Sequence, residues 1–169
     1  MTSHHALPEA FGAGRPRRVA LVLLAAYLAA GAGAQERPPT QTFEIRVWAI
    51  RASKTETRVS RELRAMAREL RRRFNYKGFV LERKSTGKAA AGKAYAAGLV
   101  GNYKARVTPV ARKGDRVTLR IEVLRREGKQ DKSLLKTTAT IRRARFQLLG
   151  GWRIDSKSDD VLIVGISAR

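Results

Sequence analysis

An unbroken alternation of apolar and polar side chains runs through Val117-Thr118-Leu119-Arg120-Ile121-Glu122-Val123. Successive residues of a β-strand point to opposite faces of the sheet, so this segment predicts a strand with one buried face. The same alternation occurs in residues 103–108 and 135–141. Two more continuously apolar segments, residues 146–149 and 161–166, are typical of central strands. Turns separate these segments, which together predict an antiparallel meander.

The turn before this segment predicts how two strands pair. Val107 and Leu119 share the apolar face only if the hairpin loop has an odd number of residues, and Lys113-Gly114-Asp115 supplies such a loop. This register places Arg106 opposite Glu122 as a cross-strand ion pair.

A strand and a helix precede the meander. Residues 42–52 alternate like the later strands, and Ser60 is a predicted N-cap of the helix that follows. The helix carries an apolar stripe within an arc of roughly 100°. The stripe consists of Leu63, Met66, Ala67, Leu70 and Phe74. Such a stripe predicts packing on a sheet.

Glycine marks the predicted ends and loops of the N-terminal part. Residues 75–78 are expected to end the helix, with Gly78 able to take positive φ, and residues 79–84 to form a short strand. A basic Gly/Ala/Lys-rich loop is expected at residues 85–93. It approaches a phosphate-binding loop, but Ala94 stands where that loop needs Ser or Thr. A turn is expected at residues 150–160.

The order of elements predicts an α+β fold. One amphipathic helix packs on a mainly antiparallel sheet, with a β-α-β unit followed by a β meander.

The N-terminus has the pattern of a cleavable export signal. Arginines at 15, 17 and 18 precede an apolar run, residues 19–28, which is followed by small residues ending in Ala32-Gly33-Ala34. A membrane anchor is the alternative, but the apolar run is only about half of the ~20 residues that a span needs. We therefore expect a signal peptide at 1–34, an extended leader at 35–41 and a single domain at 42–169.

Composition narrows the function. Without residues 1–34 the chain keeps 135 residues and a net charge of +20, no cysteine, and no histidine because His4 and His5 are lost. The commonest general base, metal ligand and thiol nucleophile are therefore missing. We expect no catalytic residue, no cofactor and no metal, and a protein that is not an enzyme; an unrecognised hydrolase is the third alternative.

Two groups of cations are candidate sites for a polyanion. The first is the helix face opposite the apolar stripe: Arg61, Arg64, Arg68, Arg71 and Arg72. The second is the non-core side of the central strands: Lys104, Arg106, Arg120 and Lys136. Arginines at 142, 143 and 145 gather in a turn.

The expected function is that of an exported, periplasmic or secreted, accessory or binding domain. Its partner is an envelope polysaccharide, lipopolysaccharide or nucleic acid held without sequence preference. Two alternatives stand beside it. The charge serves solubility alone, or the chain is a protein–protein module of an envelope or secretion assembly, with Trp48 and Trp152 as contacts.

The last third resembles a known family. The succession of residues 117–123, 134–140, 146–151 with its final Gly-Gly, and 161–166 resembles the strands of the outer-membrane secretin domain. The whole chain is also similar to small exported bacterial β-rich proteins of unassigned function. The resemblance implies an envelope location and an antiparallel sheet, and it carries over no functional residue.

Overall fold

A computed structural model describes residues 41–156 and 158–169. The predicted signal peptide and the leader up to residue 40 lie outside the described residues. The chain order is β1 (Thr42–Ser53), the 3₁₀ helix η1 (Arg61–Met66), α1 (Ala67–Phe74), β2 (Gly78–Ala90), β3 (Tyr95–Gly98), β4 (Tyr103–Lys113), β5 (Arg116–Glu127), β6 (Gln130–Arg142), β7 (Gln147–Arg153) and β8 (Val161–Ala168).

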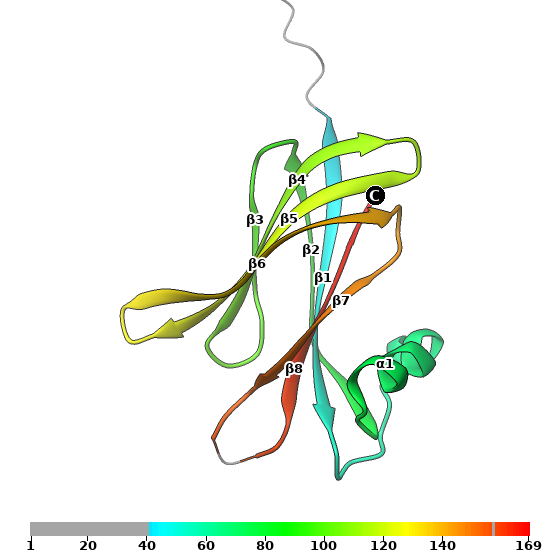
Figure 1. The fold of residues 1–169 in the computed structure, drawn as a ribbon, viewed down its shortest axis with the longest axis vertical. Coiled ribbons are helices and arrows are strands. Elements are labelled where there is room, and N and C mark those ends of the chain that lie inside the picture. The colour runs from blue at the N-terminus through cyan, green and yellow to red at the C-terminus, as the bar shows by residue number, and fades with distance from the viewer. Residues whose placement is uncertain (1–40, 157) are drawn as a thin grey trace, which may run out of the picture. The chain divides into compact units, whose positions relative to one another are not determined.

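The strands form two antiparallel sheets, where a single sheet was predicted. Sheet 1 has the order β2-β1-β8-β7 and sheet 2 the order β3-β4-β5-β6 (Figure 1). The difference arises because β1 pairs with β8, from Ile45 opposite Ala168 to Ala52 opposite Val161. The last strand therefore joins the first one, and β3 to β6 form a separate layer. The fold is mainly β, and the predicted α+β arrangement on one sheet is wrong.

The larger core lies between the two sheets. β1 and β8 contribute Ile45, Val47 and Val164, while β5 contributes Leu119 and Ile121, and each of these five is at most 1% exposed. Burying one such aliphatic side chain stabilises a fold by about 1.5–3 kcal/mol. The alternating pattern of residues 117–123 is confirmed, because its apolar positions all belong to this core.

A second core lies on the other face of sheet 1. There Leu63 of η1 and Leu70 of α1, both 0% exposed, pack against Ile50 and Ile163. Figure 1 shows α1 beside the part of β1 near Ser53. The predicted apolar stripe therefore does pack on a sheet.

The predicted helix has two parts with different geometry. Residues 61–66 form a 3₁₀ helix and only 67–74 an α-helix. Ser60 precedes the first turn but does not cap it through its side chain. Its hydroxyl instead accepts a hydrogen bond from the backbone N–H of Leu81 on β2 (2.9 Å).

The helix ends within the predicted segment 75–78, but the residue with positive φ is Asn75 and not the predicted Gly78. Asn75 has φ 51° and its N–H donates to the carbonyl of Arg71 (3.1 Å). Asn tolerates this left-handed conformation because its short polar side chain bonds locally. Gly78 is buried in β2, where a Cβ would lie 2.5 Å from the carbonyl oxygen of Glu56.

The strands extend into two predicted loops, through most of the first and through the first four residues of the second. β2 continues to Ala90 through most of the expected loop 85–93, because Thr42 to Arg46 of β1 pair with it. Gly87 makes room there for the ring of Tyr95, which a Cβ would overlap. β7 similarly runs to Arg153 into the expected turn 150–160, and a Cβ at Gly150 would lie 2.6 Å from the Cα of Ile163.

The β4–β5 register is as predicted, although the loop is not. Arg106 lies opposite Glu122, and their side chains form an ion pair of 2.9 Å. The loop has two residues, since Lys113 pairs with Arg116. A bulge between Pro109 and Ala111 restores the alternation by leaving Val110 43% exposed.

One ion network fastens the helix-proximal end of sheet 1. Arg51 of β1 donates to Glu82 (2.7 Å), Asp160 (3.1 Å) and Glu56 (3.2 Å). These carboxylates, Glu82 first, raise the pKa of Arg51 above its usual value. Among the described residues, no helix is long and apolar enough to span a bilayer.

Candidate functional site

The helix arginines lie on the surface, as their spacing predicted. Arg61, Arg64, Arg68, Arg71 and Arg72 are all exposed. The last three share one side of α1, but the first two belong to η1, where residues three apart eclipse each other. The predicted continuous five-arginine face is therefore divided between two helical geometries. The one ion pair within α1 joins Arg73 to Glu69 (3.7 Å).

The predicted strand cations share the outer face of sheet 2. Arg106 and Lys136 flank Glu122 in one cross-strand row, and Arg120 lies between Thr108 and Thr138. Two of the four cations have carboxylate partners: Arg106 pairs with Glu122 (2.9 Å) and Lys104 with Asp131 (3.4 Å). Arg120 and Lys136 have no ion pair among the residues that the structure describes.

A third group of cations lies on the same face and was missed at the sequence level. Lys113 on β4 lies opposite Arg116 on β5, which lies opposite Arg142 on β6. We call these three residues the basic row. Directly opposed residues have Cα atoms about 4.5–5.5 Å apart, so three cations occupy roughly 10 Å of the sheet.

The basic row has no local charge compensation. All three side chains are exposed, and within the described part of the chain none forms an ion pair. The neighbouring carboxylate, Asp115, forms none either, although its backbone oxygen accepts from the N–H of Arg143 (2.6 Å). Like charges directly opposite on a sheet are destabilising by about 0.2–1 kcal/mol per pair, and a bound anion relieves that repulsion.

The sheet backbone holds the row in place. Beside it, the hydroxyls of Thr118 and Thr140 hydrogen-bond across β5 and β6 at 3.0 Å. The face thus combines Lys113, Arg116, Arg120, Lys136 and Arg142, all without a carboxylate partner among the described residues, on a hydrogen-bonded scaffold. This arrangement suits a repeating anion better than a single small ion, because the cations span several rows.

Only part of the row could have been found from the sequence. Lys113 and Arg116 flank a Gly-Asp turn, which places them opposite each other once a two-residue loop is recognised. Arg142 was noted only as part of a turn with Arg143 and Arg145. Its position in the row depends on the β5–β6 bulge near Leu124, which the sequence pattern did not predict.

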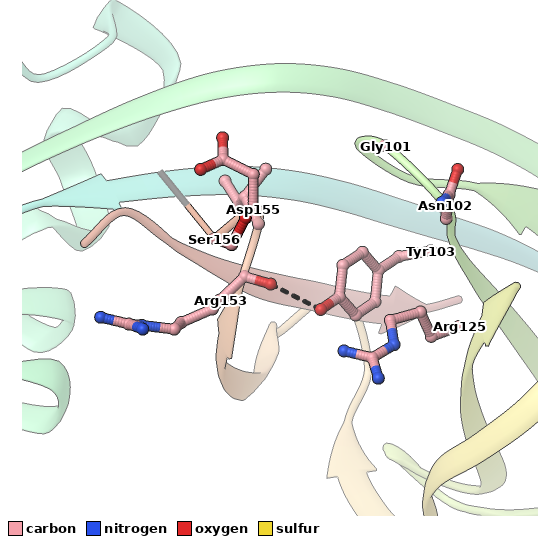
Figure 2. Close-up of a pocket in the computed structure, with 8 residues that line it drawn as sticks. Gly101, Asn102, Tyr103, Arg125, Arg153, Asp155 and Ser156 are labelled. Carbon is pink, nitrogen blue, oxygen red and sulfur yellow. Dashed lines mark hydrogen bonds between the residues drawn. The ribbon is translucent and has the colours of Figure 1, made fainter. Parts of the chain in front are cut away.

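A depression of about 350 Å³ lies between the start of β4 and the end of β7. Figure 2 shows the Tyr103 hydroxyl directed at the backbone oxygen of Arg153, to which it donates a hydrogen bond of 2.6 Å. Arg125 pairs with Glu127 and Arg153 with Asp159. Arg125 lowers the pKa of Glu127, which keeps that carboxylate charged. Both cations of this depression therefore have anionic partners already.

An adjoining depression of about 440 Å³ shares Gly101, Asn102 and Tyr103 with the first. Its rim includes Arg83 and Arg126, which form no ion pair among the described residues. It extends the positive surface but gathers no nucleophile with a base. In the described ranges, no three His, Cys, Asp or Glu residues are grouped to hold a metal ion.

The two tryptophans take part in the cores. Trp48 packs at the edge of the second core, 4.3 Å from Phe146 between ring centroids, and Trp152 packs against the first. Both are only partly exposed. They are therefore poorer candidates for partner contacts than the sequence alone predicted.

No protein-family model matches the chain, and no curated protein matches it. Among solved structures, the chain is similar to the type II secretion system secretin XcpQ from Pseudomonas aeruginosa, with 11% identity and a TM-score of 0.31. The match covers 75% of this chain and 55% of the secretin chain, so this chain spans about half of its neighbour. A likeness at this level bears on neither fold nor function.

Proposed function

We propose that this chain is an exported, non-enzymatic binding domain whose outer face of sheet 2 holds an extended polyanion. The observation that carries the proposal is the basic row of Lys113, Arg116 and Arg142 on three adjacent strands, without an ion pair among the described residues. Arg120 and Lys136 extend the row along β5 and β6. Arg116 and Arg120 are four residues apart on β5, or about 14 Å, and Lys136 and Arg142 are six apart on β6, or about 20 Å, so the cations are spaced for repeated anionic groups.

The ligand class follows from this spacing and from the packing of both tryptophan rings against the cores of the described chain. Polymers that carry phosphate, sulfate or carboxylate at each repeat satisfy several cations at once, and binding is driven by counterion release. Single-stranded nucleic-acid readers also need exposed aromatic side chains, and here Trp48 and Trp152 pack in the cores. We therefore propose contact through charge, without base recognition.

Export and the lack of an enzymatic role complete the proposal. The signal pattern of residues 1–34 supports a periplasmic or secreted location, where lipopolysaccharide and acidic polysaccharides are available polyanions. The chain has no cysteine, and its two histidines lie within the proposed signal. A binding role uses what remains, which is cationic surface on a rigid sheet.

The test is a comparison of two triple substitutions with the same loss of charge. One variant changes Lys113, Arg116 and Arg142 to Gln, and the other changes Arg64, Arg68 and Arg72 to Gln. Binding of heparin and of duplex DNA to the purified proteins is measured from 50 to 200 mM salt. If all five sheet cations contact the ligand, the slope of log K against log salt is about −4.5, or roughly a 500-fold loss across this range.

The sheet variant should lose about 2.7 units of that slope, while the helix variant should lose less than about one. Equal losses would show that binding follows total charge, and the sheet surface would then be no site. Weak binding by the unmodified protein at ~150 mM salt would favour the solubility role of the charge.

A second function is favoured by a different observation. The edge of sheet 2 at β6 has no backbone partner among the described residues, which suits a protein–protein module of an envelope or secretion assembly.

A further inference from the structure

Strand β6 forms the edge of sheet 2 along its whole length. It pairs with β5 on one side, from Gln130 opposite Glu127 to Arg142 opposite Arg116. Outside this ladder, residues 131–141 make no backbone hydrogen bond to any described part of the chain. The N–H and C=O groups that point away from β5 are therefore open to another strand.

The other three sheet edges are short or covered in part. β3 has four residues, and β7 has seven, with a register irregularity between Gly150 and Trp152. β2 has 13 residues, and the segment before η1 covers only its start: Phe79 donates to the carbonyl of Arg58 (2.8 Å) and Leu81 to the hydroxyl of Ser60 (2.9 Å). β6, also with 13 residues, has no such cover from the described chain between residues 131 and 141.

The core is incomplete along β6. On β5, the four core-facing side chains from Val117 to Val123 are 0% exposed. On β6, Leu135, Thr137 and Ala139 face the same core opposite Val123, Ile121 and Leu119, yet each is only partly buried. A further strand beside β6 would cover them in the way that β6 covers β5.

The cations on the outer face of β6 determine which charge an added strand should carry. Lys136 and Arg142 lie on that face, exposed and without an ion pair among the described residues. They are six residues apart, which is about 20 Å along a strand. A second copy of the chain would bring the same cations to this edge, so the matching occupant is acidic.

We propose that β6 accepts an extended acidic segment of a partner protein as an added strand of sheet 2. The segment has two carboxylates six residues apart on one face, beside Lys136 and Arg142. Its other face carries small apolar side chains that cover Leu135 and Ala139. This inference does not depend on polyanion binding, because main-chain pairing and alternation carry it.

The first test uses two peptides of the same composition. Both have nine residues, in which valine and threonine alternate from an N-terminal valine and two residues are replaced by glutamate. One has the glutamates at its second and eighth positions. The other has the residues at its seventh and eighth positions exchanged, which keeps the composition and moves one carboxylate to the core face. Fluorescence anisotropy should show the first peptide binding at least about fivefold more tightly. Equal affinities would overturn the proposal, since attraction by charge alone ignores the face.

The second test blocks the edge with proline. Consecutive N–H groups of a strand point to opposite edges. One of the variants Thr138→Pro and Ala139→Pro therefore removes a hydrogen bond to β5, and the other removes an N–H group on the free edge. The variant that keeps the melting temperature of the unmodified protein should bind the first peptide at least about tenfold more weakly. Its heparin affinity should stay within about twofold, because its charge is unchanged. Unchanged peptide binding would sink strand addition and leave the polyanion proposal standing.

Hydrogen exchange of the unmodified protein provides a readout that needs no variant. Binding of the first peptide should slow exchange at alternate amides between residues 135 and 141, which are those facing the free edge. Bound peptide without slowed exchange in β6 would place the contact elsewhere and overturn the proposal. Loss of heparin binding in a Lys113→Gln/Arg116→Gln variant, which keeps Arg142, with these amides still protected by peptide, would separate the two functions.

Discussion

The protein carries two cationic surfaces built on different scaffolds. On the helical segment, Arg68, Arg71 and Arg72 project from one side of an eight-residue helix that a single stripe of apolar side chains holds to sheet 1. On sheet 2, Lys113, Arg116 and Arg142 are fixed by two ladders of backbone hydrogen bonds. Similar numbers of cations therefore differ in arrangement: those of the helix lie within about one turn, and those of the sheet are spread over three strands.

The largest effect is expected from detaching the helical surface. Leu70→Ala removes a fully buried side chain that joins α1 to the second core, and should lower the free energy of unfolding by about 2–5 kcal/mol. Urea unfolding measures this loss. The exposed Arg68→Ala on the same helix, as control, should change stability by less than about 0.5 kcal/mol.

Heparin affinity of the folded Leu70→Ala protein should stay within about twofold, because the basic row lies on the other sheet. A large loss of heparin affinity in the folded variant would mean that both surfaces bind heparin together, which would contradict their separation.

A smaller effect is expected from removing a carboxylate from each surface. Glu122→Gln releases Arg106 on the sheet, and Glu69→Gln releases Arg73 on the helix, with the same change in net charge. The sheet variant should bind heparin roughly fivefold more tightly at ~150 mM salt, with a slope steeper by about 0.9. The helix variant should bind like the unmodified protein. Equal gains in a salt titration would remove the distinction between the sheet and the helix cations.

The smallest effect concerns one left-handed residue beside each surface. Ala144, with φ 61°, follows the basic row, and Asn75, with φ 51°, ends α1. Ala144→Gly should stabilise the fold by about 0.5 kcal/mol, the relief of φ strain being partly offset by the flexibility of glycine in the unfolded chain. Asn75→Gly should leave the stability almost unchanged, since Asn already tolerates this conformation. Thermal melting measures both, and a larger gain at Asn75 would contradict this ranking.

Local patterns in the sequence predicted what depends on neighbours along the chain. The alternation from Val117 to Val123 gave the buried face of β5, and the hairpin gave Arg106 opposite Glu122. The loop length was wrong and the register still right, because the bulge at Val110 compensates for the shorter turn. Burial of the alternating face determines register more strongly than the turn does.

Features that depend on distant partners were missed. Lys88, Ala89 and Ala90 have low strand propensity and are strand because β1 lies beside them. The division into two sheets depends on β1 pairing with β8, more than 100 residues away, and alternation does not identify neighbouring strands. The basic row was missed for the same reason, since Arg142 reaches Arg116 only through the β5–β6 ladder.

Each core of this protein has its own tryptophan, and the chain has two in all. Trp48 lies tilted against Phe146 beside the second core, and its buried indole N–H has no hydrogen-bond partner among the described residues, whereas Trp152 lies against the first core. The protein thus contains a pair of built-in fluorophores, one for each layer. With Trp48→Phe and Trp152→Phe variants, emission during denaturation would report the melting of the helix layer and of the sandwich separately. Coincident transitions would show that the two layers unfold as a single cooperative unit. Separate transitions would show that the helix layer unfolds from sheet 1 independently of the sandwich.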